Sequence, residues 1–231
     1  MIQFAGVVKS YQGLRPLRVA ELAVERGDRL ALSGFDAAAA EVFINLITGA
    51  AVPDEGDVRI GGRSTREIAT DTEWLASLDR FGVVTERAIF LESMSLAANL
   101  ALPFTLAIDP LTAGTRARVE GLAQEVGLPK GLLEAPASTL APDERLRAHL
   151  ARALAAGPEL LLLEHPTARL ERRAADAIGT TLKVVGAGRG VGWIALTEDA
   201  GFAKASGARR LQLDPATGQL HRQGFWRRLM S

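Results

Sequence analysis

The residues of this 231-residue sequence best suited to chemistry are Glu164 and His165, which directly follow four consecutive leucines. A carboxylate at the end of a buried strand can bind Mg²⁺, and a neutral imidazole with a pKa of about 6.5 can accept a proton near neutral pH. By residue type alone, Glu164 is compatible with a metal ligand and His165 with a general base. The alternative is a structural histidine satisfied by backbone partners at a strand end.

A second segment, LALSGFDAAAAE, has the strand, turn and helix layout in which phosphate-binding loops occur. A working loop reads GxxxxGK[ST]: glycines let backbone N–H groups surround phosphate, lysine contacts the β and γ phosphates, and the hydroxyl binds Mg²⁺. Gly34 is kept, but the second glycine, the lysine and the hydroxyl residue are replaced by Ala39, Ala40 and Glu41. Because consecutive alanines favour helix, we expect the loop to be closed or wound into the helix, with Asp36 or Glu41 at its N-terminus.

Further segments stand in the order found in the ATP-binding cassettes of ABC transporters, which this sequence resembles from Tyr11 to about Gly218. FGVVTERAIFLESMSLAANLALP resembles the Q-loop region, with Glu86 at the glutamine position. STLAPDERLRAHLARAL resembles the signature segment, whose Ser-Gly-Gly-Gln positions are occupied by Ala141, Pro142, Asp143 and Glu144. Glu198 stands where the family has its switch histidine.

The resemblance also assigns roles to the remaining candidates. LLLLEHPTARLE is similar to the Walker B segment, with Glu164 at the Mg²⁺-binding aspartate and His165 at the catalytic glutamate. Tyr11 stands where the family has an aromatic residue that stacks on adenine. The resemblance thus implies ATP and Mg²⁺ as cofactors, while the substituted positions predict that their binding is weak or absent.

The arrangement of apolar runs predicts the elements that position these residues. Short apolar runs alternate with longer helical stretches, which is typical of an α/β fold with a mostly parallel sheet. Residues 1–26 predict an antiparallel β flap with a turn near Gly13. We expect core strands at residues 29–33, 82–85, 159–163, 192–196 and 210–213. By resemblance the whole chain, 1–231, is one P-loop NTPase-like cassette, with a core at 1–90 and 155–231 and an inserted helical subdomain at about 91–154.

Composition narrows the classes of partner. The chain has 27 basic and 27 acidic residues, whereas a nonspecific nucleic-acid binder usually has a basic surplus, so we expect no nucleic-acid partner. No apolar run approaches the roughly 18 residues that a membrane span needs, and we expect no direct span. The absence of cysteine fits a reducing compartment. Together with the membrane partner that the resemblance implies, these features lead us to expect a cytoplasmic protein held peripherally at the inner face of the cell membrane.

The scaffold is kept while the charged positions are exchanged, so the sequence predicts a degenerate ATPase with a structural or regulatory role. The resemblance implies two partners, a transmembrane permease subunit and a second cassette, either a copy of this chain or an intact paralogue. One alternative is an active ATPase whose substituted residues rearrange around nucleotide. Another is a soluble interaction module derived from a cassette.

Overall fold

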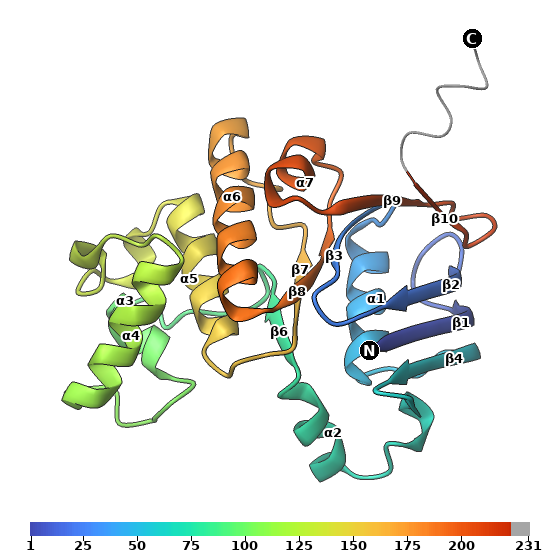
Figure 1. The fold of residues 1–231 in the computed structure, drawn as a ribbon. Helices are drawn as coiled ribbons and strands as arrows, with labels where there is room; N and C mark the ends of the chain where they lie inside the picture. Colours follow the sequence, from blue (N-terminus) through green and yellow to red (C-terminus); the bar gives the residue numbers. More distant parts are fainter. Residues whose placement is uncertain (223–231) are drawn as a thin grey trace.

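In the computed structural model, which describes residues 1–222, the chain forms two β-sheets with a helix between them and further helices around them (Figure 1). The first sheet is antiparallel, in the order β2-β1-β4-β5. Its strands are β1 (Ile2–Lys9), β2 (Leu17–Val24), β4 (Glu55–Ile60) and β5 (Arg63–Ser64). The pairing of β1 with β2 confirms the predicted flap. β4 and β5 are not predicted: β5 has only two residues, and in β4 only Val58 and Ile60 alternate with charged residues.

The second sheet forms the centre of the molecule and has the order β10-β9-β3-β8-β7-β6. Its strands are β3 (Arg29–Ser33), β6 (Phe81–Val84), β7 (Leu160–Glu164), β8 (Gly192–Leu196), β9 (Arg209–Leu213) and β10 (Leu220–Arg222). All neighbours are parallel except β9 and β10. This confirms the mostly parallel sheet, and each predicted core strand is found within one residue of its expected bounds.

Helices cover both faces of the central sheet. These helices are α1 (Ala37–Thr48), α6 (Arg172–Arg189) and α7 (Ala200–Ser206). α2 (Asp71–Leu78) buries no residue, and its Trp74 donates to the carbonyl of Thr48 in α1 at 3.1 Å. α1 lies between the two sheets and shares one buried cluster with them, whereas α6 and α7 pack on the other face (Figure 1). Strand β8 shows both environments: Ile194 belongs to the cluster with α1, and Trp193 to the cluster with α6.

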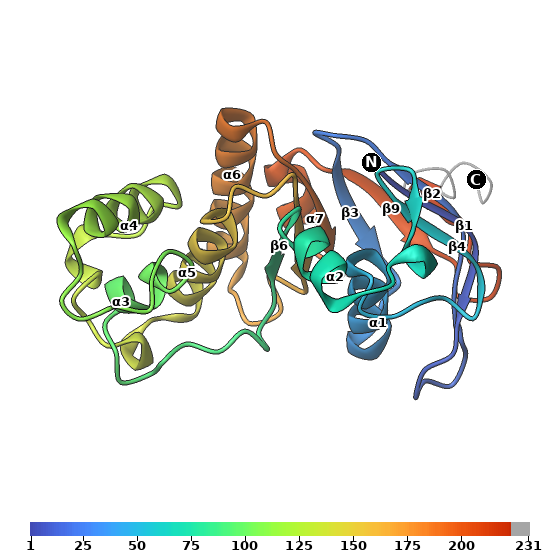
Figure 2. The ribbon, with the colours of Figure 1, turned by 90° about the horizontal axis from the view of Figure 1, so that it is seen from below.

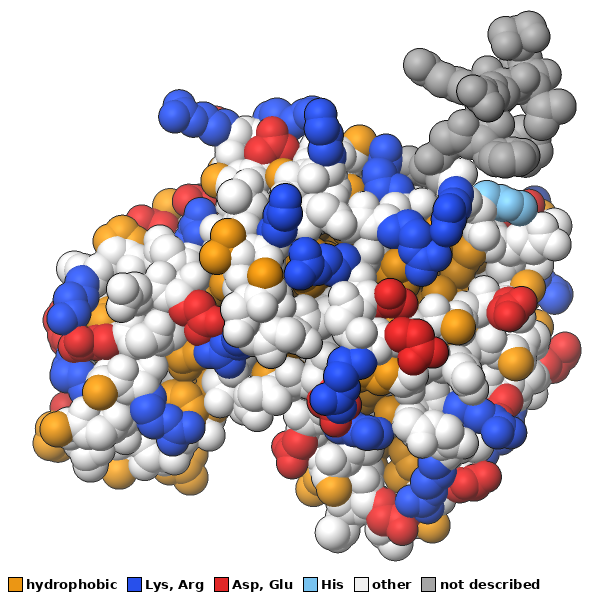
Figure 3. Space-filling view, in the orientation of Figure 1, with side chains coloured by type: hydrophobic (Ala, Val, Ile, Leu, Met, Phe, Trp, Pro, Cys, Tyr) orange, Lys and Arg blue, Asp and Glu red, His pale blue; other side chains and the backbone are white. Residues whose placement is uncertain are grey.

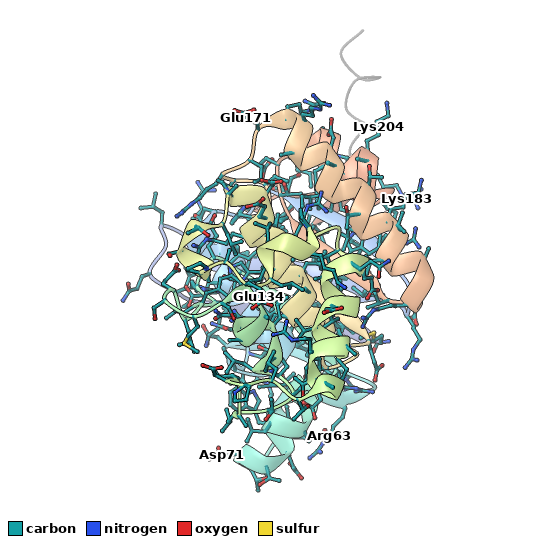
Figure 4. All side chains as sticks on the ribbon, turned by 90° about the vertical axis from the view of Figure 1, so that its left-hand side faces the viewer. Arg63, Asp71, Glu134, Glu171, Lys183 and Lys204 are labelled. Carbon is teal, nitrogen blue, oxygen red and sulfur yellow. The ribbon has the colours of Figure 1, made fainter. Side chains whose placement is uncertain are left out.

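Three helices lie together at one end of the molecule, away from the antiparallel sheet (Figures 1 and 2). They are α3 (Leu96–Ala101), α4 (Ala113–Glu125) and α5 (Pro142–Leu154), joined by loops and short 3₁₀ turns. We call residues 91–154 the α3–α5 region; Figure 4 views the molecule from this side, with Glu134 in front. Its buried cluster continues into the central sheet through Leu161 and Leu163. The division into core and helical subdomain therefore stays a prediction.

The surface carries both charge signs. In Figure 3, Lys and Arg side chains are interspersed with Asp and Glu across the face shown. Within residues 1–222, no helix is both long enough and apolar enough to cross a bilayer.

Buried His149 in α5 generates a prediction about pH. Its ring packs against Phe90 in a tilted arrangement at a centroid distance of 4.3 Å, and burial, together with the positive charges of Arg152 and Arg145, lowers its pKa to about 4. Between about pH 6.5 and 4, His149 binds a proton in the unfolded chain but not in the folded chain, so the free energy of unfolding is highest above pH 6.5 and falls as pH falls to 4. We expect the free energy of unfolding of the parent chain to fall by about 3 kcal/mol more than that of His149→Phe over this range. Urea unfolding at a series of pH values measures the difference, and parallel curves for the two proteins would contradict it.

Gly34 generates a second prediction because its backbone has no room for a side chain. Its φ is +89°, and an added Cβ would lie 2.7 Å from the carbonyl oxygen of Leu213 in β9. We expect Gly34→Ala to lower the free energy of unfolding by about 2–3 kcal/mol. Gly121→Ala is the matched control: this residue lies within α4 with no atom within 4 Å of its added Cβ, so the same change there should stabilise slightly. Equal effects at both sites, measured by urea unfolding, would refute the argument.

Candidate functional site

Several of the sequence-predicted positions follow strands that end at one edge of the central sheet, because β3, β6, β7 and β8 are parallel. Glu164, at the end of β7, is in register with the last residue of β8, and Glu198 follows two positions later. Gly34 follows β3, and Glu86 follows β6. Gly34 and Glu198 are in direct contact although they are 164 positions apart in sequence.

The backbone N–H groups of the loop that precedes α1 hold carboxylates of the chain itself. α1 begins at Ala37, and Asp36 is its N-cap, with Oδ1 accepting from the backbone N–H of Ala39 at 2.7 Å. The N–H of Gly34 donates to Oε1 of Glu198 at 2.6 Å. These are the donors that an anion at a helix N-terminus would use. The expectation that the alanines wind into the helix, with Asp36 at its N-terminus, is confirmed.

Glu41 lies elsewhere, in an ion-pair cluster centred on Arg87. One guanidinium nitrogen of Arg87 lies 2.5 Å from Oε2 of Glu41, and the other lies 2.7 Å from Oε2 of Glu164. The Glu164 side chain is only 10% exposed, so the guanidinium neutralises a nearly buried carboxylate. Sequence reasoning missed Arg87. The available signal was the gain of carboxylates at motif positions, which calls for a nearby cation.

Glu86 and His165 lie beside this cluster. The Glu86 carboxylate pairs with Arg169 at 3.0 Å. His165 has a φ of +43°, unusual for a non-glycine residue; its N–H donates to the carbonyl of Leu196 at 3.0 Å, and its own carbonyl accepts from Ala168. Its ring Nε2 is buried and has no hydrogen-bond partner in the described chain. The backbone of His165 thus has partners at the strand end, whereas Nε2 of its ring has none in the described chain.

The signature positions form the first turn of α5 and are joined to one another by a hydrogen bond. Ala141 is the N-cap and Pro142 the first helical residue, where a missing N–H costs nothing. The N–H of Ala141 donates to Oε2 of Glu144 at 2.9 Å. Asp143 and Glu144 place negative charge at the positive end of the helix dipole. This turn therefore favours cations over phosphate.

Tyr11 lines a cavity of about 390 Å³ together with Gly34, Asp36 and Ala39. Burial and the negative charge of Asp36 both raise the pKa of the Tyr11 phenol, so the ring is neutral at neutral pH. The cavity thus has an aromatic wall, but its neighbouring carboxylate opposes an anion. In residues 1–222, no three His, Asp or Glu side chains are grouped so that they could hold a metal ion.

Comparisons with known proteins agree with this architecture. Residues 17–168 match the ABC transporter family. The lipoprotein-releasing system ATP-binding protein LolD of Alcanivorax borkumensis is 29% identical over 208 residues, covering 88% of this chain and 90% of the relative. The sulfate/thiosulfate import ATP-binding protein CysA 2 of Chromobacterium violaceum is 32% identical over 180 residues, covering 78% and 47% respectively.

The fold is also similar to that of a solved cassette. MJ0796, described as a bacterial ABC transporter cassette, superimposes with a TM-score of 0.77 at 23% identity, and the alignment covers 96% of this chain and 97% of that one. The family match spans the segments that carry Gly34, Glu86 and Glu164. The chain therefore belongs to the ABC transporter family, as an ATP-binding cassette.

Proposed function

We propose that this cassette is a structural or regulatory subunit of a transporter, with weak or absent ATP binding and hydrolysis. The observation that carries the proposal is the Arg87 cluster, in which a guanidinium lies between Glu41 and Glu164. By resemblance, these are the positions of the Mg²⁺-binding hydroxyl and the Mg²⁺-binding carboxylate. Because the Arg87 guanidinium already lies between these two carboxylates, the arrangement does not fit Mg²⁺.

The electrostatics of the phosphate loop support the same conclusion. Asp36 and Glu198 hold the backbone N–H groups that would bind phosphate. A triphosphate would bring several negative charges towards these carboxylates, and each pair at about 5 Å and an effective dielectric of about 20 costs on the order of 3 kcal/mol. Two or three such repulsive pairs are enough to remove micromolar affinity for ATP.

An active ATPase is the second candidate, favoured by one observation, the cavity beside Tyr11. In that alternative, Glu198 leaves Gly34 and Arg87 leaves Glu164 when nucleotide binds. The proposal of an inactive cassette requires neither movement.

For partners we propose a membrane permease and a second cassette. Similar proteins support both: one relative, from Aeromonas hydrophila, is a macrolide export ATP-binding/permease protein, and a solved structure of MJ0796 is a dimer. These partners would place the chain at the cytoplasmic face of the membrane. Paired with an intact cassette, this chain would weaken both composite sites, since its phosphate loop and its signature are both substituted.

A binding measurement on the purified chain tests the loss of nucleotide chemistry. Titration with a fluorescent ATP analogue in the presence of Mg²⁺ should give no saturable binding at micromolar concentrations, and phosphate release should stay at background, because carboxylates hold the phosphate donors. An intact cassette such as LolD serves as the positive control. Micromolar affinity together with turnover that Glu164→Ala or His165→Ala abolishes would overturn the proposal.

The assignment of Arg87 to the cation position has its own test. We expect Arg87→Gln to lower the free energy of unfolding by about 1–2 kcal/mol, since it leaves Glu41 and the nearly buried Glu164 unpaired. We also expect millimolar Mg²⁺ to raise the melting temperature of this variant, because two carboxylates then lack their cation, and to leave the parent chain unchanged. Arg116→Gln, which removes an exposed pair with Glu134, is the control. Failure of Mg²⁺ to stabilise Arg87→Gln selectively would contradict the assignment.

A further inference from the structure

The charges of the chain balance overall but are unevenly distributed along the sequence. Residues 200–231 contain six basic residues and one acidic residue, whereas residues 1–199 contain 21 basic and 26 acidic residues. The acidic one, Asp214, is engaged within its own turn, because it accepts from the backbone N–H of Ala216 and from the hydroxyl of Thr217. The last part of the chain therefore carries a surplus of positive charge.

Four of these cations lie around the outer edge of the central sheet. Lys204 is in the last turn of α7, and Arg209 and Arg210 begin β9. Arg222 ends β10, the outermost strand, opposite Leu211 of β9. The side chains of Lys204, Arg209 and Arg222 are exposed, and that of Arg210 is half-buried. The antiparallel pairing of β9 with β10 thus brings cations together from two segments of the chain.

Lys183 of α6 adds a fifth cation. Its Cδ and Cε would lie 3.8 Å from a Cβ on Gly207, which connects α7 to β9. Figure 4 shows Lys183 and Lys204 on the same side of the molecule, and in Figure 3 Lys and Arg side chains gather over β9. We call these five residues the basic edge: Lys183, Lys204, Arg209, Arg210 and Arg222.

The basic edge has no counter-charge of its own. None of its side chains forms an ion pair or a hydrogen bond within residues 1–222. Glu21 of β2 lines the same groove as Arg209, of about 500 Å³, but does not pair with it. By contrast, several exposed cations elsewhere are paired, as Arg116 is with Glu134. Unpaired cations in one place create a positive potential, which favours an anionic partner.

Residues 223–231 lie outside the described part of the chain, but their sequence indicates the kind of anion. They add Arg227 and Arg228 directly after Phe225 and Trp226. Aromatic side chains prefer the interface between membrane and water, and basic side chains prefer anionic headgroups. A free phosphate would use the cations but not the aromatic residues, and a nonspecific nucleic-acid binder usually has a basic surplus over the whole chain. In a member of the ABC transporter family, this combination favours a lipid surface.

We propose that the basic edge, together with residues 223–231, binds the anionic headgroups of a phospholipid membrane. The cations contact the headgroups, and Phe225 and Trp226 supply apolar surface for the interface. Each Lys or Arg near an anionic membrane raises the affinity about fivefold, so several cations together give stable binding. This direct contact with lipid is additional to the attachment through a permease proposed above, and it uses neither ATP nor the site at the other end of the strands.

Sedimentation of the full purified chain with lipid vesicles tests this proposal. We expect binding to vesicles of phosphatidylcholine with about one third phosphatidylglycerol, and at least about tenfold weaker binding to phosphatidylcholine alone. Raising NaCl from about 0.1 M to about 0.5 M should weaken binding to the anionic vesicles, because salt screens exposed charges. Equal binding to both kinds of vesicle, or binding to neither, would overturn the proposal.

Variants locate the binding to the basic edge. The double variant Arg209→Gln/Arg222→Gln removes two exposed cations and no contact within residues 1–222, and should weaken binding to the anionic vesicles about 20-fold. Trp226→Ala should also weaken it, although the charge is unchanged. Arg116→Gln/Lys130→Gln is the matched control: it lowers the net charge equally, within the α3–α5 region, and should bind like the parent. Equal weakening by the two double variants would refute the site, with circular dichroism melting curves verifying that each variant is folded.

Competing anions distinguish lipid from other partners. Inorganic phosphate or a single-stranded oligonucleotide, added to the parent chain with anionic vesicles, should release no more protein than NaCl of equal ionic strength. Specific release by phosphate would assign the basic edge to a free phosphate, and specific release by the oligonucleotide would assign it to nucleic acid; either result would overturn the proposal. These measurements contain neither nucleotide nor permease, so this proposal and that of an inactive cassette can fail independently.

Discussion

Carboxylates that gather at one edge of a parallel sheet repel one another unless a cation or a backbone donor lies between them. Here β3, β7 and β8 bring Glu164 and Glu198 to the same edge, and α1 adds Glu41. The chain resolves this with its own groups: Arg87 neutralises two of these carboxylates, and the N–H of Gly34 binds the third. Each of these three carboxylates thus has a partner within the chain.

The ion pairs of Arg87 also position the segment between β6 and α3, which connects the central sheet to the α3–α5 region. Arg87 ties the segment to the sheet, while the α3–α5 region holds it from the other side. Arg152 of α5 donates to the carbonyl of Ile89 at 2.8 Å, and the Asn99 side chain bonds to both the N–H and the carbonyl of Leu91. Asn99 is fully buried, so these bonds are shielded from water. These hydrogen bonds join the segment after β6 to α5 and α3.

The fold was readable from the sequence because its buried strands are short apolar runs with clear ends. The strands at Arg29–Ser33 and Gly192–Leu196 coincide with the prediction to the residue, since they are covered on both faces. The charged strands β4 and β5 contain no such apolar run. At the site, Asp36 was foreseeable because an acidic residue before a run of alanines is a strong N-cap. Arg87 was not, because its partners lie on α1 and β7 and only the folded sheet brings them together.

The one phosphate-loop residue that survives is explained by packing alone. Gly34 adopts a positive φ while its Cα faces the backbone of Leu213, so only glycine fits there whether or not a phosphate binds. Its N–H is held by Glu198. Ala39 and Ala40, which replace the other loop residues, are buried in the cluster that joins α1 to both sheets. Gly34, Ala39 and Ala40 thus serve the joint between strand and helix, whether or not a nucleotide binds beside them.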